Sequence, residues 1–214
     1  VTYLNFNAPN HIAVRVYDYY GEGGIVAGPI GLYKVAKDPL LEVNLTGFWF
    51  FETEKENSIR LQKQEKQIAH KIFVPGSWED NGYRNYDGIA TYTTQFKLPE
   101  KLVNQELYLV LGFIDDIDHV YLNGKKIGSV NTLKRTEKSN LPYHKIFRGY
   151  AIPNELVENE AYNNISIIVY DKGGVGGIYA GPIGIATKEN YEILKQTPVE
   201  EKSLLELFLD SFDF

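Results

Sequence analysis

The sequence has no cysteine and no methionine among its 214 residues. The lack of cysteine excludes disulfide bonds, thiolate metal sites and a cysteine nucleophile. The formal charge of −6 argues against a nucleic-acid groove and against electrostatic binding to an anionic membrane, because both need a basic surface. No apolar run approaches the ~18 residues of a membrane-spanning helix. Because methionine is missing, we expect a processed or excised chain, and any signal peptide would precede Val1.

One segment of the chain occurs twice. Residues 12–32 read IAVRVYDYYGEGGIVAGPIGL and residues 165–185 read ISIIVYDKGGVGGIYAGPIGI, with 13 of 21 positions identical at an offset of 153. Unrelated segments of ordinary composition would share about one or two positions. The sequence therefore predicts a duplication with a period of one domain length.

This period predicts three parts. Residues 1–38 are expected to be the C-terminal strands of a preceding, truncated jelly-roll repeat. Residues 39–190 are expected to form a complete jelly-roll domain, and residues 191–214 an acidic linker with an amphipathic helix. A lone terminal hairpin cannot bury its apolar face. We therefore expect residues 1–36 to pack on the second unit, to exchange strands with another chain as in a dimer, or to complete a separate polypeptide.

Most of the middle part has the alternation typical of strands. Residues 107–111 alternate as a strand buried on both faces would, and residues 91–96 and 165–170 are rich in β-forming side chains. Asn123-Gly124 lies between two apolar runs and predicts a two-residue hairpin, since both turn positions need positive φ. Many short strands with Gly, Pro and Asn turns predict an all-β jelly-roll sandwich.

Helical patterns are few. Residues 52–71 are dense in Lys, Glu and Gln, and suit either a polar loop or a short solvated helix. From Glu200 the chain reads EEKSLLELFLDSF, with apolar residues at helical spacing after a proline. The predicted fold is thus a β-sandwich with a short C-terminal helix.

The catalytic motifs of common hydrolases are missing. The sequence has no G-x-S-x-G, no H-E-x-x-H and no P-loop, so we assign no catalytic residue and no cofactor. The glycines of residues 173–177 are interpreted as a crossover with positive-φ corners rather than a phosphate loop. Asp115, Asp116 and Asp118 form the densest acidic cluster and could contribute to a calcium site, although such aspartates more often organise a turn.

A candidate carbohydrate site lies in residues 73–88, which read FVPGSWEDNGYRNYDG. Aromatic rings suit the C–H face of a sugar, and charged or amide groups suit its hydroxyls. The predicted carbohydrate-binding residues are Trp78, Glu79, Tyr83, Arg84, Tyr86, Asp87 and, from the repeat, Tyr179. The alternative is structural: Trp78 plugs one end of the core and the two loop tyrosines cover it.

Four motifs carry a resemblance to a known family. VPGSWEDNGYRNYDGIATYTTQFKLP, LGFIDDIDHVYLNGKKIG, GYAIPNELV and NNISIIVYDKGGVGGIYAGPIGI occur in this order. Over residues 45–187 they resemble the sugar-binding jelly-roll domain of glycoside hydrolase family 2, and equally the similar domain of sialate O-acetylesterases. Thr93 departs from the family pattern, where arginine is common. The resemblance implies a galactose-binding-like β-sandwich in a periplasmic or extracellular bacterial protein, whose catalytic residues belong to a separate domain.

The leading functional hypothesis is a non-catalytic carbohydrate-binding or scaffolding module of a larger glycan-processing protein, either a glycoside hydrolase or a carbohydrate esterase. Its partner would be a carbohydrate or a neighbouring catalytic domain. Two alternatives stay open. The chain could be a ligand-sensing or interaction module of a bacterial surface receptor, or a fragment of a hydrolase whose catalytic domain is absent here.

Overall fold

The structure is a computed structural model that describes residues 8–12, 14, 16, 38–63, 70–131 and 142–196. The chain divides into two compact units, Val1–Val35 and Ala36–Phe214. All the helices and strands that the structure describes belong to the second unit. Most of the predicted strands before residue 38, and the whole of the helix predicted from Glu200, lie outside the described residues.

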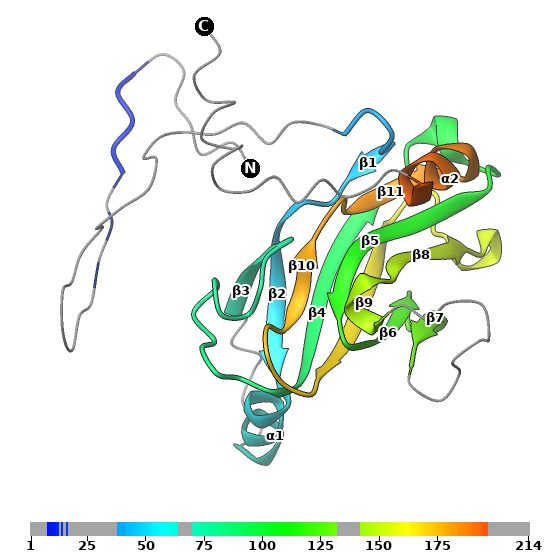
Figure 1. Cartoon of the computed structure of the whole chain (residues 1–214). Helices are drawn as coiled ribbons and strands as arrows, with labels where there is room; N and C mark the ends of the chain where they lie inside the picture. Colours follow the sequence, from blue (N-terminus) through cyan, green and yellow to red (C-terminus); the bar gives the residue numbers. More distant parts are fainter. Residues whose placement is uncertain are drawn as a thin grey trace, which may run out of the picture. The chain divides into compact units, whose positions relative to one another are not determined.

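The second unit contains two antiparallel sheets (Figure 1). The five-stranded sheet comprises β1 (Val43–Asn44), β5 (Leu107–Asp115), β8 (Phe147–Ile152), β10 (Gly177–Ala180) and β11 (Gly184–Thr187). The six-stranded sheet has the order β3 (His70–Val74), β2 (Gly47–Thr53), β4 (Gly88–Lys97), β9 (Tyr162–Asp171), β6 (Ile117–Leu122) and β7 (Lys125–Val130). In the first sheet, β10 and β11 pair with successive parts of one edge of β5, and β8 pairs with its other edge.

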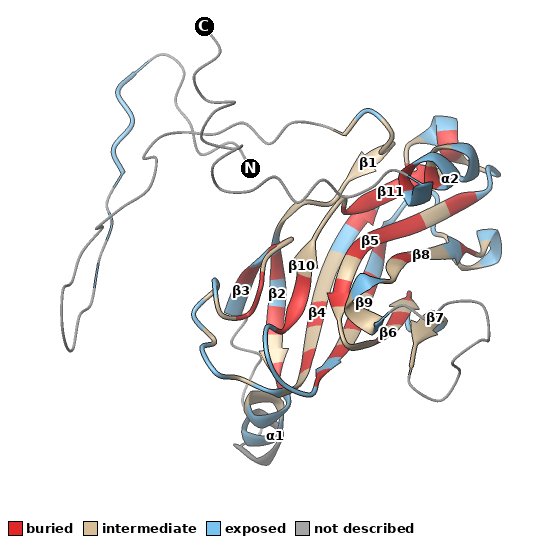
Figure 2. Cartoon of the chain, in the orientation of Figure 1, coloured by how far each residue is buried: buried red, intermediate tan, exposed pale blue. Residues whose placement is uncertain are grey.

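The apolar core lies between the two sheets, where the inward side chains of each strand are buried (Figure 2). Strand β9 shows the pattern best, because every second residue from Asn163 to Asp171 is buried. Alternation of this kind is what a strand with one face on a core requires. Asp171 therefore ends a row of core-facing side chains, although it carries a carboxylate.

The structure confirms the predicted all-β sandwich. Residues 107–111 lie in β5, which is buried on both faces because α2 (Lys188–Gln196) covers the outer one. Tyr191 of α2 stacks on Tyr108, with ring centroids 4.2 Å apart and an angle of 8° between the rings. Asn123 and Gly124 form the predicted turn between β6 and β7, with φ values of 47° and 77°.

The helices differ from the expectation in one place. In the segment that suited either a loop or a helix, the structure has α1 (Glu54–Lys63). The short C-terminal helix expected of the fold is present as α2, which lies earlier in the chain than the helical pattern that starts at Glu200. Three short 3-10 helices, at Glu100–Leu102, Tyr143–Lys145 and Asn154–Leu156, connect strands. No helix within the described ranges has the length and apolarity needed to cross a membrane.

Candidate functional site

The predicted sugar-binding loop connects β3 to β4 and is hydrogen-bonded to β10 and to the glycines before it. Gly76 N donates to Ile178 O at 2.8 Å, and Trp78 N donates to Gly176 O at 3.0 Å. On the other side, the Asn81 side chain accepts from Phe73 N at 2.9 Å and donates to a loop carbonyl. Hydrogen bonds thus join the loop to β3 on one side and to β10 and the segment before it on the other.

Trp78 is fully buried. Its ring lies 5.1 Å from Tyr86 and 6.1 Å from Phe51, and its Nε1–H donates to the Tyr92 hydroxyl at 2.5 Å. A Cβ on Gly176 would come within 2.4 Å of the indole, so only glycine fits there. The indole presents no face to a ligand in this conformation, and the arrangement matches the structural alternative in which Trp78 plugs the core.

The two loop tyrosines pack around this plug. The Tyr83 ring lies 4.7 Å from that of Phe51, and the Tyr86 hydroxyl donates to Ile89 O at 2.7 Å. Burial, together with the nearby Glu56 carboxylate, raises the pKa of Tyr83 to about 12. Both rings are half-buried, so each keeps only part of its surface for a ligand.

The polar members of the predicted site divide into two groups. Arg84 and Asp87 are exposed and form what we call the polar rim of the loop. Glu79 is turned inward, where its Oε2 accepts from Gly176 N at 3.3 Å. Tyr179 donates to His144 O at 2.7 Å and its ring lies 6.3 Å from Phe113, so these partners are outside the loop.

The aspartates predicted for calcium have different surroundings. Asp118 is fully buried and accepts from Arg148 Nε at 3.0 Å, and the Tyr150 hydroxyl donates to its other oxygen. A carboxylate with these two partners serves to join β6 to β8 and is not free to bind a cation with Asp115 and Asp116. Within the described ranges, no group of three or more His, Cys, Asp or Glu is arranged to hold a metal ion.

Each of two inward carboxylates, Asp171 and Glu79, has one buried oxygen without a hydrogen-bond partner among the described residues. Sequence reasoning named Glu79 but missed Asp171. Asp171 is 1% exposed; its Oδ1 accepts from Gly173 N at 2.9 Å, but its buried Oδ2 has no hydrogen-bond partner among the described residues. The same holds for Oε1 of Glu79. Burial, followed by the nearby Asp87, raises the pKa of Asp171. One sequence signal existed, because the duplicated segment has aspartate in both copies, as Asp18 and Asp171.

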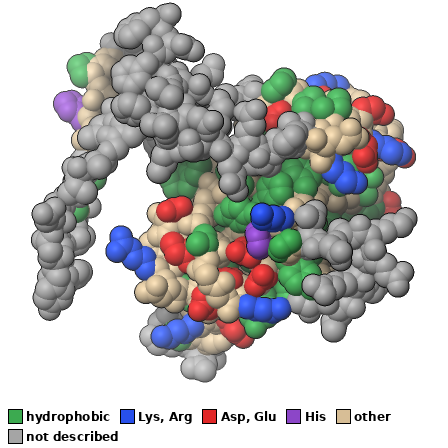
Figure 3. Space-filling view, in the orientation of Figure 1, with side chains coloured by type: hydrophobic (Ala, Val, Ile, Leu, Met, Phe, Trp, Pro, Cys, Tyr) green, Lys and Arg blue, Asp and Glu red, His purple; other side chains and the backbone are tan. Residues whose placement is uncertain are grey.

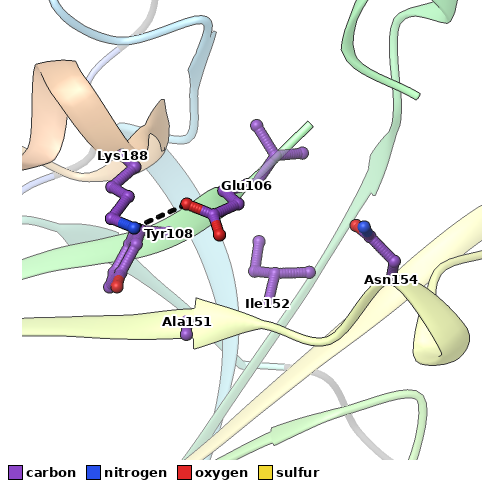
Figure 4. A pocket seen from close by; sticks show the side chains of 7 residues that line it. Glu106, Tyr108, Ala151, Ile152, Asn154 and Lys188 are labelled. Atoms are coloured by element: carbon purple, nitrogen blue, oxygen red, sulfur yellow. Dashed lines mark hydrogen bonds and ion pairs between the residues drawn. The ribbon is translucent and has the colours of Figure 1, made fainter. Parts of the chain in front are cut away.

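A separate shallow hollow of about 200 Å³ lies at the start of β5 (Figure 4). Lys188 and Glu106 form an ion pair there, with 2.7 Å between Nζ and Oε2. The hollow has one carboxylate in its lining and none of the predicted carbohydrate-binding residues. Retaining or inverting glycoside hydrolysis needs two carboxylates across a sugar bond, so this hollow lacks that arrangement.

Comparisons with known proteins give structural neighbours and no family. No family model matches the chain, and no curated protein matches it. The similar solved structures include a β-glucuronidase of Ruminococcus gnavus, with 21% identity and a TM-score of 0.48 over 65% of this chain and 23% of that one. They also include β-glucuronidases of an uncultured Clostridium species (18%, TM-score 0.47, 66% and 24%) and of Dictyoglomus thermophilum (21%, TM-score 0.46, 65% and 21%). This chain thus spans less than a quarter of the length of these glycoside hydrolases.

Proposed function

We propose that this chain is a non-catalytic accessory module of a larger glycan-processing protein, and that it serves there mainly as a scaffold that docks on a neighbouring domain. The observation that carries this proposal is the placement of the aromatic rings. Trp78, whose type and position suggested a sugar platform, is part of the core. Three phenylalanines on the outer face of the six-stranded sheet are exposed instead.

These residues form the phenylalanine face: Phe48, Phe50 and Phe73, which are 68%, 44% and 36% exposed. Phe48 lies opposite Phe73 across β2 and β3, with ring centroids 5.3 Å apart in an edge-to-face arrangement. The Lys71 ammonium lies 5.7 Å from the centre of the Phe50 ring. Adjacent exposed aromatic rings beside a cation are typical of a protein interface. We propose that the partner is an apolar surface with a carboxylate that pairs with Lys71.

Substitution of Phe48 tests this docking. Phe48→Thr keeps β-propensity and removes an exposed ring, so the melting temperature of the isolated chain should fall only slightly, through loss of the edge-to-face contact with Phe73. In the full-length protein, the same variant should lower the melting temperature of this module, because a docked partner stabilises the folded state. Tyr162→Thr is the matched control, since Tyr162 is 57% exposed on β9 of the same sheet. Equal effects of the two substitutions in the full-length protein would contradict docking through the phenylalanine face.

The carbohydrate-binding role rests on the polar rim, where Arg84 and Asp87 can reach hydroxyl groups. A glycan-array screen of the purified chain, followed by calorimetric titration of any hit, measures this role. Arg84→Ala is the informative variant, because its side chain is exposed and its loss leaves the core intact. Binding that disappears in Arg84→Ala without a change in melting temperature would assign the rim to a sugar. No binding to any glycan would leave the scaffold role alone.

A further inference from the structure

The second copy of the duplicated segment, residues 165–185, has a defined place in the sandwich. It comprises most of β9, all of β10 and the start of β11. β9 lies between β4 and β6 and pairs with both, while β10 and β11 pair with β5. These residues, which we call the closing segment, thus complete both sheets. The remainder of the sandwich, which precedes β9 from residue 39 onward, is called the body.

The two copies differ least where the closing segment faces the core. Ten of its positions are buried, and eight of these ten have the same residue in the first copy, residues 12–32. The two buried differences exchange one aliphatic side chain for another. Ile167 has Val14 as its counterpart, and Ile185 has Leu32. Of the eleven other positions six differ, and most of these change charge or polarity. A strand presents a given set of side chains to the core in one register only, so a matching inward set indicates a matching place in a fold.

The first copy also keeps the glycines that the closing segment needs for close packing. A Cβ on Gly176 would lie 2.4 Å from the Trp78 ring, and one on Gly177 would lie 2.9 Å from it. A Cβ on Gly184 would lie 2.2 Å from the carbonyl oxygen of Val43. The counterparts of these three glycines are Gly23, Gly24 and Gly31. Glycine at such positions allows another group to approach the backbone closely. The first copy is therefore suited to a body that has an aromatic plug like Trp78.

The body in this chain is already closed. β9 pairs with β4 over its whole length, and β4 pairs with β2 at its other edge, so β4 has no edge for a further strand. Strand exchange between two copies of this chain would leave one segment over, because each copy brings one described body and two segments of the closing type. The described apolar residues of the first copy are exposed: Ile12, Val14 and Val16 are 72%, 65% and 49% exposed, although their counterparts on β9 are buried. Figure 3 shows hydrophobic side chains at the surface of this short described stretch.

We propose that residues 12–32 close a second jelly-roll sandwich of the full-length protein, built like the one described here. Ile12, Val14 and Val16 enter its core as the inward residues of β9 do, and the glycine pair that follows packs against its aromatic plug. The partner is thus a sandwich body without closing strands of its own, and main-chain hydrogen bonds on both edges hold the inserted strand. The proposal rests on the larger protein of the proposed function but uses no residue of the phenylalanine face, so the two are tested separately.

A graft in the whole chain tests whether the first copy fits such a place. The closing segment is replaced with the sequence of residues 12–32, except that glycine stays at position 173, where φ is 144°. The graft should melt cooperatively within about 10 °C of the wild type, because the core changes only by Ile167→Val and Ile185→Leu. Circular dichroism follows the melt.

A graft that is out of register by one residue is the matched control. It places residues 13–19 at positions 165–171, which turns the inward side chains outward and puts arginine at the buried position 167. This control should show no cooperative melt. An unfolded in-register graft, or equal melts of the two grafts, overturns the proposal and leaves the test of the phenylalanine face unaffected.

Hydrogen–deuterium exchange then tests the partner. The amides of residues 12–18 should exchange slowly in the full-length protein and fast in the isolated chain, because the second sandwich is present only in the former. Val14→Asp should remove this protection, since it places a charge in the partner's core. Ala13→Asp, which adds the same charge on the opposite face of the strand, should keep it. Equal exchange of this segment in the two proteins, or protection that Val14→Asp leaves intact, overturns the proposal.

Discussion

Replacement of Trp78 by alanine is expected to lower the free energy of unfolding by about 3–5 kcal/mol, as deletions of large buried aromatic side chains do. The side chain has no exposed surface, and its ring contacts Phe51 and Tyr86. The deletion also removes the indole N–H that donates a hydrogen bond to the buried Tyr92 hydroxyl. Single domains are stable by about 5–15 kcal/mol, so this one substitution would remove a large share of the total.

Two milder variants separate the contributions of packing and hydrogen bonding. Trp78→Phe keeps much of the ring but leaves the Tyr92 hydroxyl without its donor, and Tyr92→Phe leaves the indole N–H without its acceptor. Both are expected to weaken the fold, and Tyr92→Phe should cost about 1–3 kcal/mol because it leaves the buried indole N–H unsatisfied. The double variant removes both polar partners and should cost less than the two single losses together, which a double-mutant cycle measures directly.

Urea denaturation followed by far-ultraviolet circular dichroism is the suitable assay, because it does not depend on the fluorescence of the replaced indole. A decrease of less than about 1 kcal/mol in the free energy of unfolding for Trp78→Ala would refute the reasoning, since deletion of a buried tryptophan side chain typically costs about 3–5 kcal/mol. Such a result would show that the indole is exposed in solution, and would return it to the candidate sugar-binding surface.

Other residues give predictions of the same kind. Burial and neighbouring carboxylates raise the pKa of Asp115 to about 6, against 3.8 unperturbed, so its stabilising contribution is fully present below pH 3.8 and is lost as the pH rises through about 6. Thermal melts across this range should show Asp115→Asn more stable than the wild type at pH 7 and no advantage near pH 3.8. Gly176→Ala should cost about 1–3 kcal/mol in urea denaturation, because its methyl group would overlap the Trp78 ring. Arg148→Met leaves the buried Asp118 carboxylate without its cation, and the same assay should register a loss of about 3–5 kcal/mol.

The sequence predicts the strands well where local rules decide them. Alternation identified β5, β-forming residue types identified β9, and the Asn123-Gly124 pair identified the turn in which both residues adopt positive φ. A short C-terminal helix was expected, but its position at α2 was not, because this segment is short and mostly polar, with Tyr191 and Leu194 as its buried residues. Its position depends on stacking against Tyr108, a contact between residues 83 positions apart that no local pattern shows.

The candidate site was harder to predict than the fold. The loop contained the expected residue types, but whether Trp78 faces solvent or core depends on Tyr92 and Gly176, which other strands bring to it. In the same way, Asp118 looked like a cation ligand until β8 placed Arg148 against it. The sequence shows which residue types lie near one another along the chain, whereas the direction of a side chain depends on partners that are distant in the sequence.

Hydrogen–deuterium exchange of the isolated chain and of the full-length protein tests the scaffold function most directly. The amides of β2 (Gly47–Thr53) and of the edge strand β3 (His70–Val74) should exchange more slowly in the full-length protein, because a docked domain covers the phenylalanine face. Exchange of the loop at residues 79–88 should be unaffected by added glycans. Equal exchange of both strands in the two proteins, together with glycan-dependent protection of that loop, would contradict a scaffold and establish a sugar-binding module.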